Sequence, residues 1–399
     1  MSLLLNIQQR NSVLSTMAQL LEEEREAILD ANKIDMESYS GNDLAMHDRL
    51  KVDHAKIDGM ILSLQQLVNL EDPLGVERFQ FTHENGMQVS NKTAPFGTVL
   101  IIYESRPDVT IEAAGIAFKS GNKILLKGGK ESLNSNVVLL YLWHKALEAH
   151  QVATDWVTYL QFDRSETQAF LEKPSQKVDL IVPRGGEKLI SFVKQHATCP
   201  VIVSGRGNNF VYVDKDADLQ MAVDIIINAK TTKISACNAL DKVLIASDLP
   251  RKGQFLQLLI QELEKRKVEI FADRNIASID GTKPIEDEQI WYEEFLDYKI
   301  VLGQTIDLED AIAKINTYGG GHSASILTQN NETAAYFMNN VDCAAVYHNV
   351  STRFTDGGQF GLGAELAIST DKLHQRGPIG LQHLVTNKWY IKGSGQVRE

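Results

Sequence analysis

The stretch 97-GTVLIIYESRPDVTIEAAGIAFKSGNKILLKGG-129 decides the fold, because it predicts a strand, a helix and a second strand in direct succession. Residues 97–103 and 123–129 are short apolar runs, which are typical of buried strands. The segment between them, 109–120, predicts a helix. A helix that joins two strands is the crossover of a βαβ unit, so this stretch predicts an α/β protein with a parallel sheet.

The same alternation continues toward the C-terminus. Further strands are predicted over 157–162, 178–182 and 201–204, and helices over 135–148, 187–197 and 219–229. A second series has strands over 242–247, 268–273, 323–328 and 344–350, and helices over 254–265, 307–316 and 332–340. We therefore predict two α/β domains, and a cleft between them is the natural place for a site.

The N-terminal part predicts helices and a projecting hairpin. Residues 12–32 and a segment that ends near Leu70 have helical periodicity. At 79–94, Asn85 and Gly86 lie between two strand-like runs, which is a strong signal for a β-hairpin. We interpret this hairpin as an arm that contacts a partner subunit.

Composition narrows the class of protein. The chain has 399 residues, of which 43% are hydrophobic and 23% charged, and its net charge is −12. Such an acidic chain is a poor candidate for binding nucleic acid or a membrane surface. Three cysteines, no signal-like start and no long apolar run predict a soluble cytoplasmic protein with reduced thiols.

Two glycine pairs directly follow predicted strands. They lie in 126-LKGGKES-132 and 182-VPRGGEKLI-190, and each segment carries a cation, Lys127 or Arg184. Ordinary strand-to-helix turns are one interpretation. Two such loops on one sheet instead favour a dinucleotide, since glycine admits a phosphate to free N–H groups of the next helix. Lys127 would suit the 2′-phosphate of NADP, although a G-x-G-x-x-G motif is absent.

One cysteine has a setting that suits a nucleophile. Cys237 lies in 233-KISACNALDK-242, a polar segment with Lys233 before it and Asn238 after it. Nearby lysines would favour the thiolate, and the Asn238 amide would suit an oxyanion. A small core residue is the alternative. The other two cysteines lie beside apolar strands and fit that alternative.

Three arginines lie in loops that are bounded by glycine or proline, where a guanidinium is well placed to bind a carboxylate or phosphate. The loops are 103-YESRPDVT-110, 351-STRFTDGG-358 and 374-HQRGP-378, which contain Arg106, Arg353 and Arg376. Solvated surface positions are the alternative for each. His322 is a candidate substrate donor, with a structural histidine as the alternative. No Cys or His spacing indicates a metal.

Together these segments resemble the γ-glutamyl phosphate reductase family of the aldehyde dehydrogenase superfamily. The resemblance runs from about residue 40 to residue 390 and is carried by 101–129, LNSN, VPRGGEKLI, INAK…CNAL, STRFTDGGQFGLGAELAIST and KLHQRGPIGLQHLVTNKW. It implies that Cys237 attacks L-glutamyl 5-phosphate and expels phosphate. NADPH would then reduce the thioester to L-glutamate 5-semialdehyde, the second step of proline biosynthesis from glutamate.

The resemblance also implies roles for other residues. Asn238 and Ser105 become oxyanion donors. The cofactor would contact Lys127, Arg184, Gly185, Gly186 and Glu294. Substrate contacts would come from Arg106, Lys233, His322, Arg353 and Arg376. Residues 232–234 are Thr-Lys-Ile where the family commonly has Gln-Arg-Pro, and we hypothesise that Lys233 contacts phosphate there.

The resemblance divides the chain into an aldehyde-dehydrogenase-like pair of domains and an arm. The cofactor domain would be 1–77, 95–230 and 356–377, and the catalytic domain 231–355. Residues 78–94 and 378–399 would form an oligomerisation arm, pairing across the interface of a homodimer or larger assembly. A separate glutamate 5-kinase must supply the substrate, with a transient contact as one possibility. Alternatives are a related dehydrogenase with another substrate, and a binding protein that has lost turnover.

Overall fold

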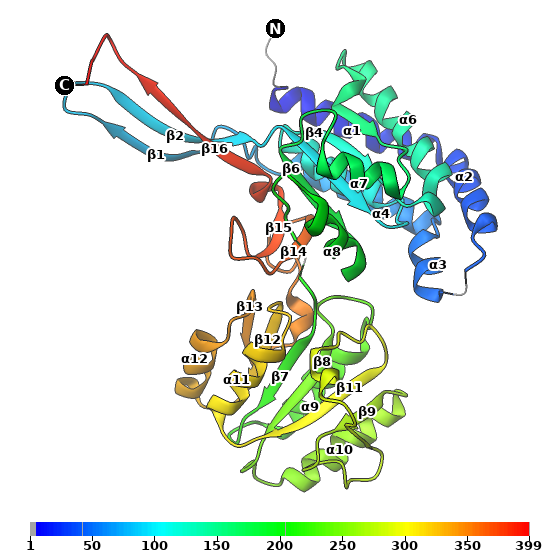
Figure 1. Ribbon diagram of the computed structural model, residues 1–399, viewed down its shortest axis with the longest axis vertical. Helices are drawn as coiled ribbons and strands as arrows, with labels where there is room; N and C mark the ends of the chain where they lie inside the picture. The colour runs from blue at the N-terminus through cyan, green and yellow to red at the C-terminus, as the bar shows by residue number, and fades with distance from the viewer. Residues whose placement is uncertain (1–4, 42, 204, 399) are drawn as a thin grey trace. The chain divides into compact units, whose positions relative to one another are not determined.

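The computed structural model describes residues 5–41, 43–203 and 205–398. The chain forms two compact units, which are coloured mainly blue to green and green to orange in Figure 1. The first unit comprises Met1–Val203, Gly361–Ala367 and Ile379–Glu399, and the second comprises Ser204–Phe360 and Ile368–Pro378.

The first unit is built on a parallel sheet of four strands in the order β5-β4-β3-β6. Its strands are β3 (Thr98–Tyr103), β4 (Lys123–Lys127), β5 (Val157–Tyr159) and β6 (Leu180–Arg184). Its helices are α1 (Ile7–Glu23), α2 (Arg25–Ser38), α3 (Leu44–Leu50), α4 (His54–Asn69), α5 (Val109–Lys119), α6 (Leu133–Ala149), α7 (Arg164–Glu172) and α8 (Glu187–His196).

The central strand β3 shows why its sequence is apolar throughout. Val99 and Ile101 point into a core shared with α1, α4, α5 and α6. The alternate residues Leu100 and Ile102 point into a second core shared with α7 and α8. Since successive side chains of a strand face opposite sides, a sheet covered on both faces needs a continuous apolar run.

The second unit contains a parallel sheet of seven strands in the order β10-β9-β11-β8-β7-β12-β13. Its strands are β7 (Asn209–Val213), β8 (Leu240–Ala246), β9 (Glu269–Ala272), β10 (Lys283–Pro284), β11 (Lys299–Thr305), β12 (Ser323–Leu327) and β13 (Ala345–His348). Its helices are α9 (Leu219–Thr231), α10 (Lys252–Lys265), α11 (Leu308–Tyr318) and α12 (Asn331–Asn340). Short 3-10 turns are η1 (Lys130–Ser132), η2 (Thr154–Trp156), η3 (Glu288–Tyr292), η4 (Thr352–Phe354) and η5 (Leu381–His383).

The predicted hairpin is present as part of a projecting arm (Figure 1). Strands β1 (Glu77–Thr82) and β2 (Gln88–Pro95) pair antiparallel, and β16 (Val385–Lys392) pairs with β2. The hairpin and the C-terminal tail therefore meet inside one chain, which corrects our expectation that they pair across an interface. A separate two-stranded sheet joins β14 (Glu365–Ser369) to β15 (Gly377–Gly380).

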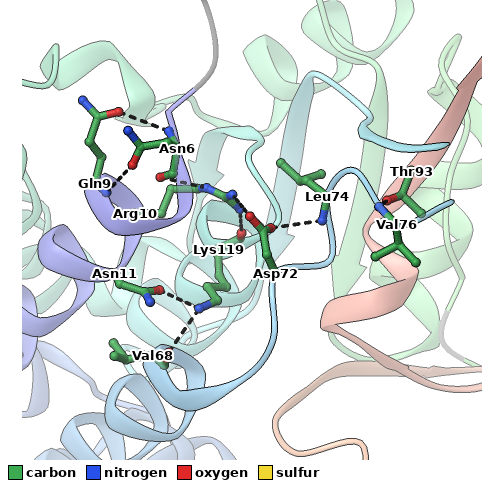
Figure 2. Close-up of polar contacts among 10 residues, drawn as sticks. All are labelled: Asn6, Gln9, Arg10, Asn11, Val68, Asp72, Leu74, Val76, Thr93 and Lys119. Atoms are coloured by element: carbon green, nitrogen blue, oxygen red, sulfur yellow. Dashed lines mark hydrogen bonds and ion pairs between the residues drawn. The ribbon is translucent and has the colours of Figure 1, made fainter. Parts of the chain in front are cut away.

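A buried polar cluster lies where the chain passes from α4 toward the arm (Figure 2). Arg10 is 1% exposed, binds Asp72 at 2.7 Å and also donates to the backbone oxygen of Lys119. The Lys119 ammonium donates to Asn11 at 2.5 Å and to the Val68 carbonyl at 3.2 Å. Burial, with Arg10 nearby, lowers the pKa of Lys119 to about 8. The cluster thus ties α1 and α5 to the segment that leads into β1.

Several elements differ from the predictions. The single helix expected over 12–32 is two helices that meet at Glu24. The strand expected at 201–204 is reduced to a bridge between Val201 and Ile181. Strands β7 and β11 and helix α7 were not predicted. Because β7 lies inside the second sheet, the unit boundary falls near residue 204, whereas the expected boundary was residue 230.

None of the described helices is both long and apolar enough to cross a bilayer. Over the same described ranges, no group of three or more His, Cys, Asp or Glu side chains is placed to hold a metal ion.

Candidate active site

The candidate nucleophile lies in the turn that connects α9 to β8. Cys237 is half-buried, and its backbone is fixed from the neighbouring strand β7. The Asn209 amide donates to the carbonyl oxygens of Cys237 at 2.8 Å and Ala239 at 2.7 Å. Two hydrogen bonds from one buried side chain hold the main chain on both sides of Asn238. No local pattern indicates this role, since Asn209 is distant from Cys237 along the chain.

Gly207 allows a close approach beside this turn. A Cβ on Gly207 would clash with the carbonyl oxygen of Cys237 and would lie 2.5 Å from the Oε1 atom of Glu294. Only a residue without a side chain fits here. The Glu294 carboxylate and the Cys237 backbone therefore line the same small space in the second unit.

Asn238 joins the cysteine turn to the Arg353 loop. Its Nδ2 atom donates to the carbonyl oxygens of Arg353 at 3.2 Å and Thr355 at 2.9 Å. In return, the Thr352 hydroxyl donates to the Asn238 carbonyl at 2.8 Å. Both amide hydrogens are thus engaged, which differs from the free amide that an oxyanion role requires. In this structure Asn238 positions a loop.

Arg353 brings a cation to the cysteine. Burial lowers the pKa of its guanidinium, whereas attraction to the Cys237 thiolate and to Asp356 acts in the opposite direction. Its Nε and Nη1 atoms are buried and have no hydrogen-bond partner among the described residues. Buried donors are rarely left unpaired, so these two N–H groups indicate a binding position for an anion.

His322 belongs to a buried network that ends at the same loop. The ring is 1% exposed, and its Nδ1 atom lies 2.7 Å from the Ser323 hydroxyl. That hydroxyl lies 2.6 Å from the Thr355 hydroxyl, which the Tyr347 hydroxyl also contacts at 2.6 Å. Burial lowers the pKa of His322 to about 4, so the ring is neutral near pH 7. Its buried Nε2 atom has no partner among the described residues.

Two other predicted substrate residues have different settings. Arg376 binds Asp342 through both the carboxylate, at 2.7 Å, and the backbone oxygen, at 2.9 Å. Lys372 binds the same carboxylate at 2.7 Å. The Arg376 guanidinium is therefore already bound to Asp342 of the same chain. Lys233 is exposed in the turn before Cys237, where its side chain is accessible to a soluble anion.

In the first unit, candidate residues gather where β3 and β6 end. Strands β3 and β6 are neighbours at the point where the strand order of the sheet reverses. In open α/β sheets, ligands bind at such a point, beside the carboxyl ends of the strands. Arg106 pairs with Asp108 at 3.0 Å. Burial and Asp108 raise the pKa of Glu112 to about 7, whereas Arg106 and Arg184 lower it. The structure thus brings two predicted arginines around Glu112, a carboxyl group that sequence reasoning missed.

The second glycine pair lies at the start of α8 and packs against Glu104. Gly186 is the N-cap residue of α8. Its backbone N–H donates to the Glu104 carboxylate at 3.2 Å. A Cβ on Gly185 would lie 2.7 Å from the Glu104 carboxyl carbon. A dinucleotide phosphate at this helix start, beside Arg184, would take the place of the Glu104 carboxylate on the Gly186 N–H.

The first glycine pair has a more structural role than expected. The Asp35 carboxylate accepts hydrogen bonds from the backbone N–H groups of Asn134 at 3.0 Å and Ser135 at 2.8 Å. It therefore fills the start of α6, where we expected free donors. Lys127 is half-buried and donates to the Gly128 carbonyl at 2.8 Å, and burial lowers its pKa.

The predicted oxyanion residue of the first unit is also paired. Ser105 is 1% exposed, and its hydroxyl donates to Glu131 at 2.7 Å. A Cβ on Gly129 would clash with this hydroxyl, so the glycine loop packs directly against Ser105. An oxyanion role for Ser105 remains a prediction.

The chain is similar to known proteins over nearly its full length. Residues 4–277 match the aldehyde dehydrogenase family. The γ-glutamyl phosphate reductase of Clostridium botulinum is 41% identical over 393 residues, covering 98% of this chain and 94% of that protein. The enzyme of that name from Thermotoga petrophila is 41% identical over 394 residues, with the same coverage.

A solved structure shows the same likeness. The crystal structure of γ-glutamyl phosphate reductase from Thermotoga maritima superposes with a TM-score of 0.94 at 40% sequence identity. The match covers 99% of this chain and 95% of that chain.

Proposed function

Because the chain belongs to the aldehyde dehydrogenase family, we propose that it reduces L-glutamyl 5-phosphate to L-glutamate 5-semialdehyde and phosphate with Cys237 as nucleophile. The relatives that match nearly the whole chain carry the name of this activity. The observation that carries the assignment to Cys237 is its electrostatic contact with Arg353, whose buried N–H groups lack partners among the described residues.

The second unit supplies the covalent chemistry. The Cys237 thiolate attacks the acyl carbon, the bond from that carbon to the phosphate oxygen breaks, and a thioester forms. Arg353 stabilises the thiolate before attack and the departing phosphate after it, since a guanidinium binds phosphate oxygens through two parallel hydrogen bonds. Asn238 holds Arg353 in place through the Arg353 carbonyl. Lys233, exposed before the turn, is a second contact for phosphate.

The first unit supplies the cofactor site. Arg184, Gly185 and Gly186 at the start of α8 hold the dinucleotide phosphates, and Lys127 holds the adenosine ribose with its 2′-phosphate. This assignment makes NADPH the preferred cofactor. When bound, the nicotinamide supplies the hydride that reduces the thioester. Glu294 is assigned to the nicotinamide ribose.

The remaining substrate contacts are assigned by charge. Arg106 binds the substrate's carboxylate, and neutral His322 contacts the substrate only through its Nε2 atom. Arg376 binds an anionic group of the substrate after this group has replaced Asp342 as the partner of the guanidinium. The backbone N–H groups after Cys237 stabilise the oxyanion.

The arm favours assembly into a homodimer or larger oligomer. Phe79, Phe81 and Trp389 are 49%, 48% and 51% exposed, and clustered exposed aromatic side chains mark interfaces. We place the protein in the cytoplasm, where its three cysteines stay reduced. A separate glutamate 5-kinase supplies the unstable acyl phosphate, and a transient contact with that kinase would limit its hydrolysis.

The test runs the reaction in the oxidative direction. Purified protein is given L-glutamate 5-semialdehyde and NADP⁺, with and without inorganic phosphate, and NADPH formation is followed. We expect turnover only with phosphate, none for Cys237→Ser, and normal turnover for the control Cys199→Ser. Turnover without phosphate would assign the protein to another dehydrogenase reaction. No turnover with cofactor still bound would favour a binding protein.

A further inference from the structure

A buried charged cluster comes from the two elements that flank the cysteine turn, α9 and β8, and has no role in the chemistry above. Lys230 at the end of α9 and Lys242 at the start of β8 are each 0% exposed, and Asp241 is 2% exposed. Lys230 binds Asp241 at 3.0 Å. Two cations and one carboxylate are thus buried together. Burying charges is costly, so such a cluster is retained where it fixes a structural position.

Lys242 contacts the residues on both sides of Glu294. Its ammonium donates to the Glu293 carbonyl at 2.7 Å. The same ammonium lies 3.9 Å from the centre of the Phe295 ring, and the Lys230 ammonium lies 5.8 Å from that ring. A cation is attracted to the face of an aromatic ring, and the attraction is stronger where water is excluded. One lysine therefore holds the main chain before Glu294 and the side chain after it.

The clamped segment is held in an unfavourable backbone conformation. Leu296 has a φ of 49°, in the left-handed region that a bulky side chain rarely adopts. Such strain persists only where surrounding contacts impose it, and it is common at functional sites. Lys242 holds the Glu293 carbonyl and the Phe295 ring, which come shortly before Leu296, and these contacts impose the left-handed conformation.

The held carboxylate faces the nucleophile turn. Glu294 Oε1 and the Cys237 carbonyl both lie against Gly207. Lys242 follows Cys237 closely on the same segment, so one short stretch delivers the thiol and fixes Glu294. We propose that Lys242 is a positioning residue that sets the Glu294 carboxylate beside the Cys237 turn, where it binds the cofactor ribose; the role of Glu294 rests on the proposed function.

The electrostatics agree with a strained cluster. The pKa of Lys242 is lowered to about 7, mainly by burial and also by Lys230 and Arg206, whereas Asp241 and Glu293 act in the opposite direction. The Lys242 ammonium therefore loses its proton more readily than an exposed lysine does. A neutral side chain would be less costly to bury at this position.

The experiment measures NADPH affinity, which does not require turnover. The dissociation constant is determined from NADPH fluorescence for wild type, Lys242→Met, Glu294→Gln and the double variant. We expect each single variant to weaken binding about tenfold, the order of effect of a lost supporting contact. The double variant should be no weaker than Glu294→Gln, because the lysine acts only through that carboxylate. Lys242→Arg, which keeps the cation and donor, should restore most of the affinity.

Two controls keep the result interpretable. Lys252→Met removes another half-buried lysine of the second unit, which donates to Ser247 and Gln304, and should leave NADPH affinity unchanged. If Lys242→Met does not fold, Phe295→Leu removes the ring side of the clamp and should weaken binding in the same non-additive way. Additive losses, or a Lys242 effect without a Glu294 effect, would overturn the proposal. Loss of phosphate-dependent turnover in wild type would instead reject the proposed function.

Discussion

Attraction to the Cys237 thiolate favours the charged form of the Arg353 guanidinium and opposes the effect of burial on its pKa, and two buried N–H groups of Arg353 have no partner among the described residues. A cation next to a thiol lowers the pH at which the thiolate forms, and unpaired donors prepare a place for the oxygen atoms that the reaction releases. The pair thus combines activation of the nucleophile with recognition of its leaving group.

Replacing Arg353 tests both functions. Arg353→Met should lower kcat/KM by about 100-fold or more, the effect of losing one preorganised donor to an anion. It should also move the pH profile of Cys237 alkylation by iodoacetamide to higher pH. Arg353→Lys should recover only part of the activity, because an ammonium cannot form two parallel hydrogen bonds. The exposed Arg274→Met is the control. Wild-type alkylation and kinetics in Arg353→Met would contradict the pairing.

Asn238 should contribute to stability as well as to the site. Asn238→Ala removes two hydrogen bonds to carbonyl oxygens, one of them fully buried, which should lower the free energy of unfolding by about 1–3 kcal/mol. Urea denaturation measures this loss. Asn316→Ala, at an exposed asparagine that also bridges two segments, should cost less than about 0.5 kcal/mol. Equal losses would show that the burial of Asn238 is unimportant.

Gly207 should tolerate no side chain. Gly207→Ala places a Cβ against the Cys237 carbonyl and the Glu294 carboxylate, so the turn must shift. Displacement of a nucleophile by about 1 Å costs on the order of 100-fold in rate. Gly253→Ala is a matched control, since nothing lies within 4 Å of its added Cβ. Steady-state kinetics compare the two. Full activity in Gly207→Ala would mean that the turn has more room than the contacts indicate.

Lys242 should make stability rise with pH above neutrality. Its pKa is about 7 in the folded chain and its ordinary value is 10.5, so between these values the unfolded chain binds a proton that the folded chain has released. Stability then rises with pH by up to about 1.4 kcal/mol per pH unit in this window. Urea unfolding between pH 7 and pH 10 should show a smaller rise for Lys242→Met than for wild type. Identical slopes would show that Lys242 keeps its proton when buried.

The arm should control assembly. Phe81→Glu puts a charge on its exposed apolar side and should shift the molar mass from light scattering to that of the monomer. Leu373→Glu, at a residue 89% exposed in the second unit, should leave the mass unchanged. A monomeric wild-type protein at all concentrations would refute the assembly.

The sequence was informative where local patterns determine structure. Asn85 and Gly86 predicted the hairpin, because few residues adopt the backbone that a tight turn requires. Strand β11 was missed because Gly303 interrupts its apolar run. The structure explains that glycine, since a Cβ there would collide with the ring of Trp291. Strand β7 was missed because it is a short run that begins with Asn209.

Within the site, the residue types could be predicted and their partners could not. The polar setting of Cys237 and the loop position of Arg353 are visible in the sequence. The engagement of Asn238 by the Arg353 loop joins segments far apart in the chain. Lys242 is at the start of an apolar strand, where a lysine usually extends to solvent, so nothing local indicated burial beside Phe295.

Trapping the acyl enzyme tests most directly whether Cys237 is the nucleophile. The protein is incubated with L-glutamate 5-semialdehyde and NADP⁺ without phosphate, digested, and analysed by mass spectrometry. We expect a glutamyl thioester on the peptide that contains Cys237, and its disappearance when phosphate is added. No adduct, or an adduct confined to Cys199 or Cys343, would contradict the assignment of Cys237 as the nucleophile.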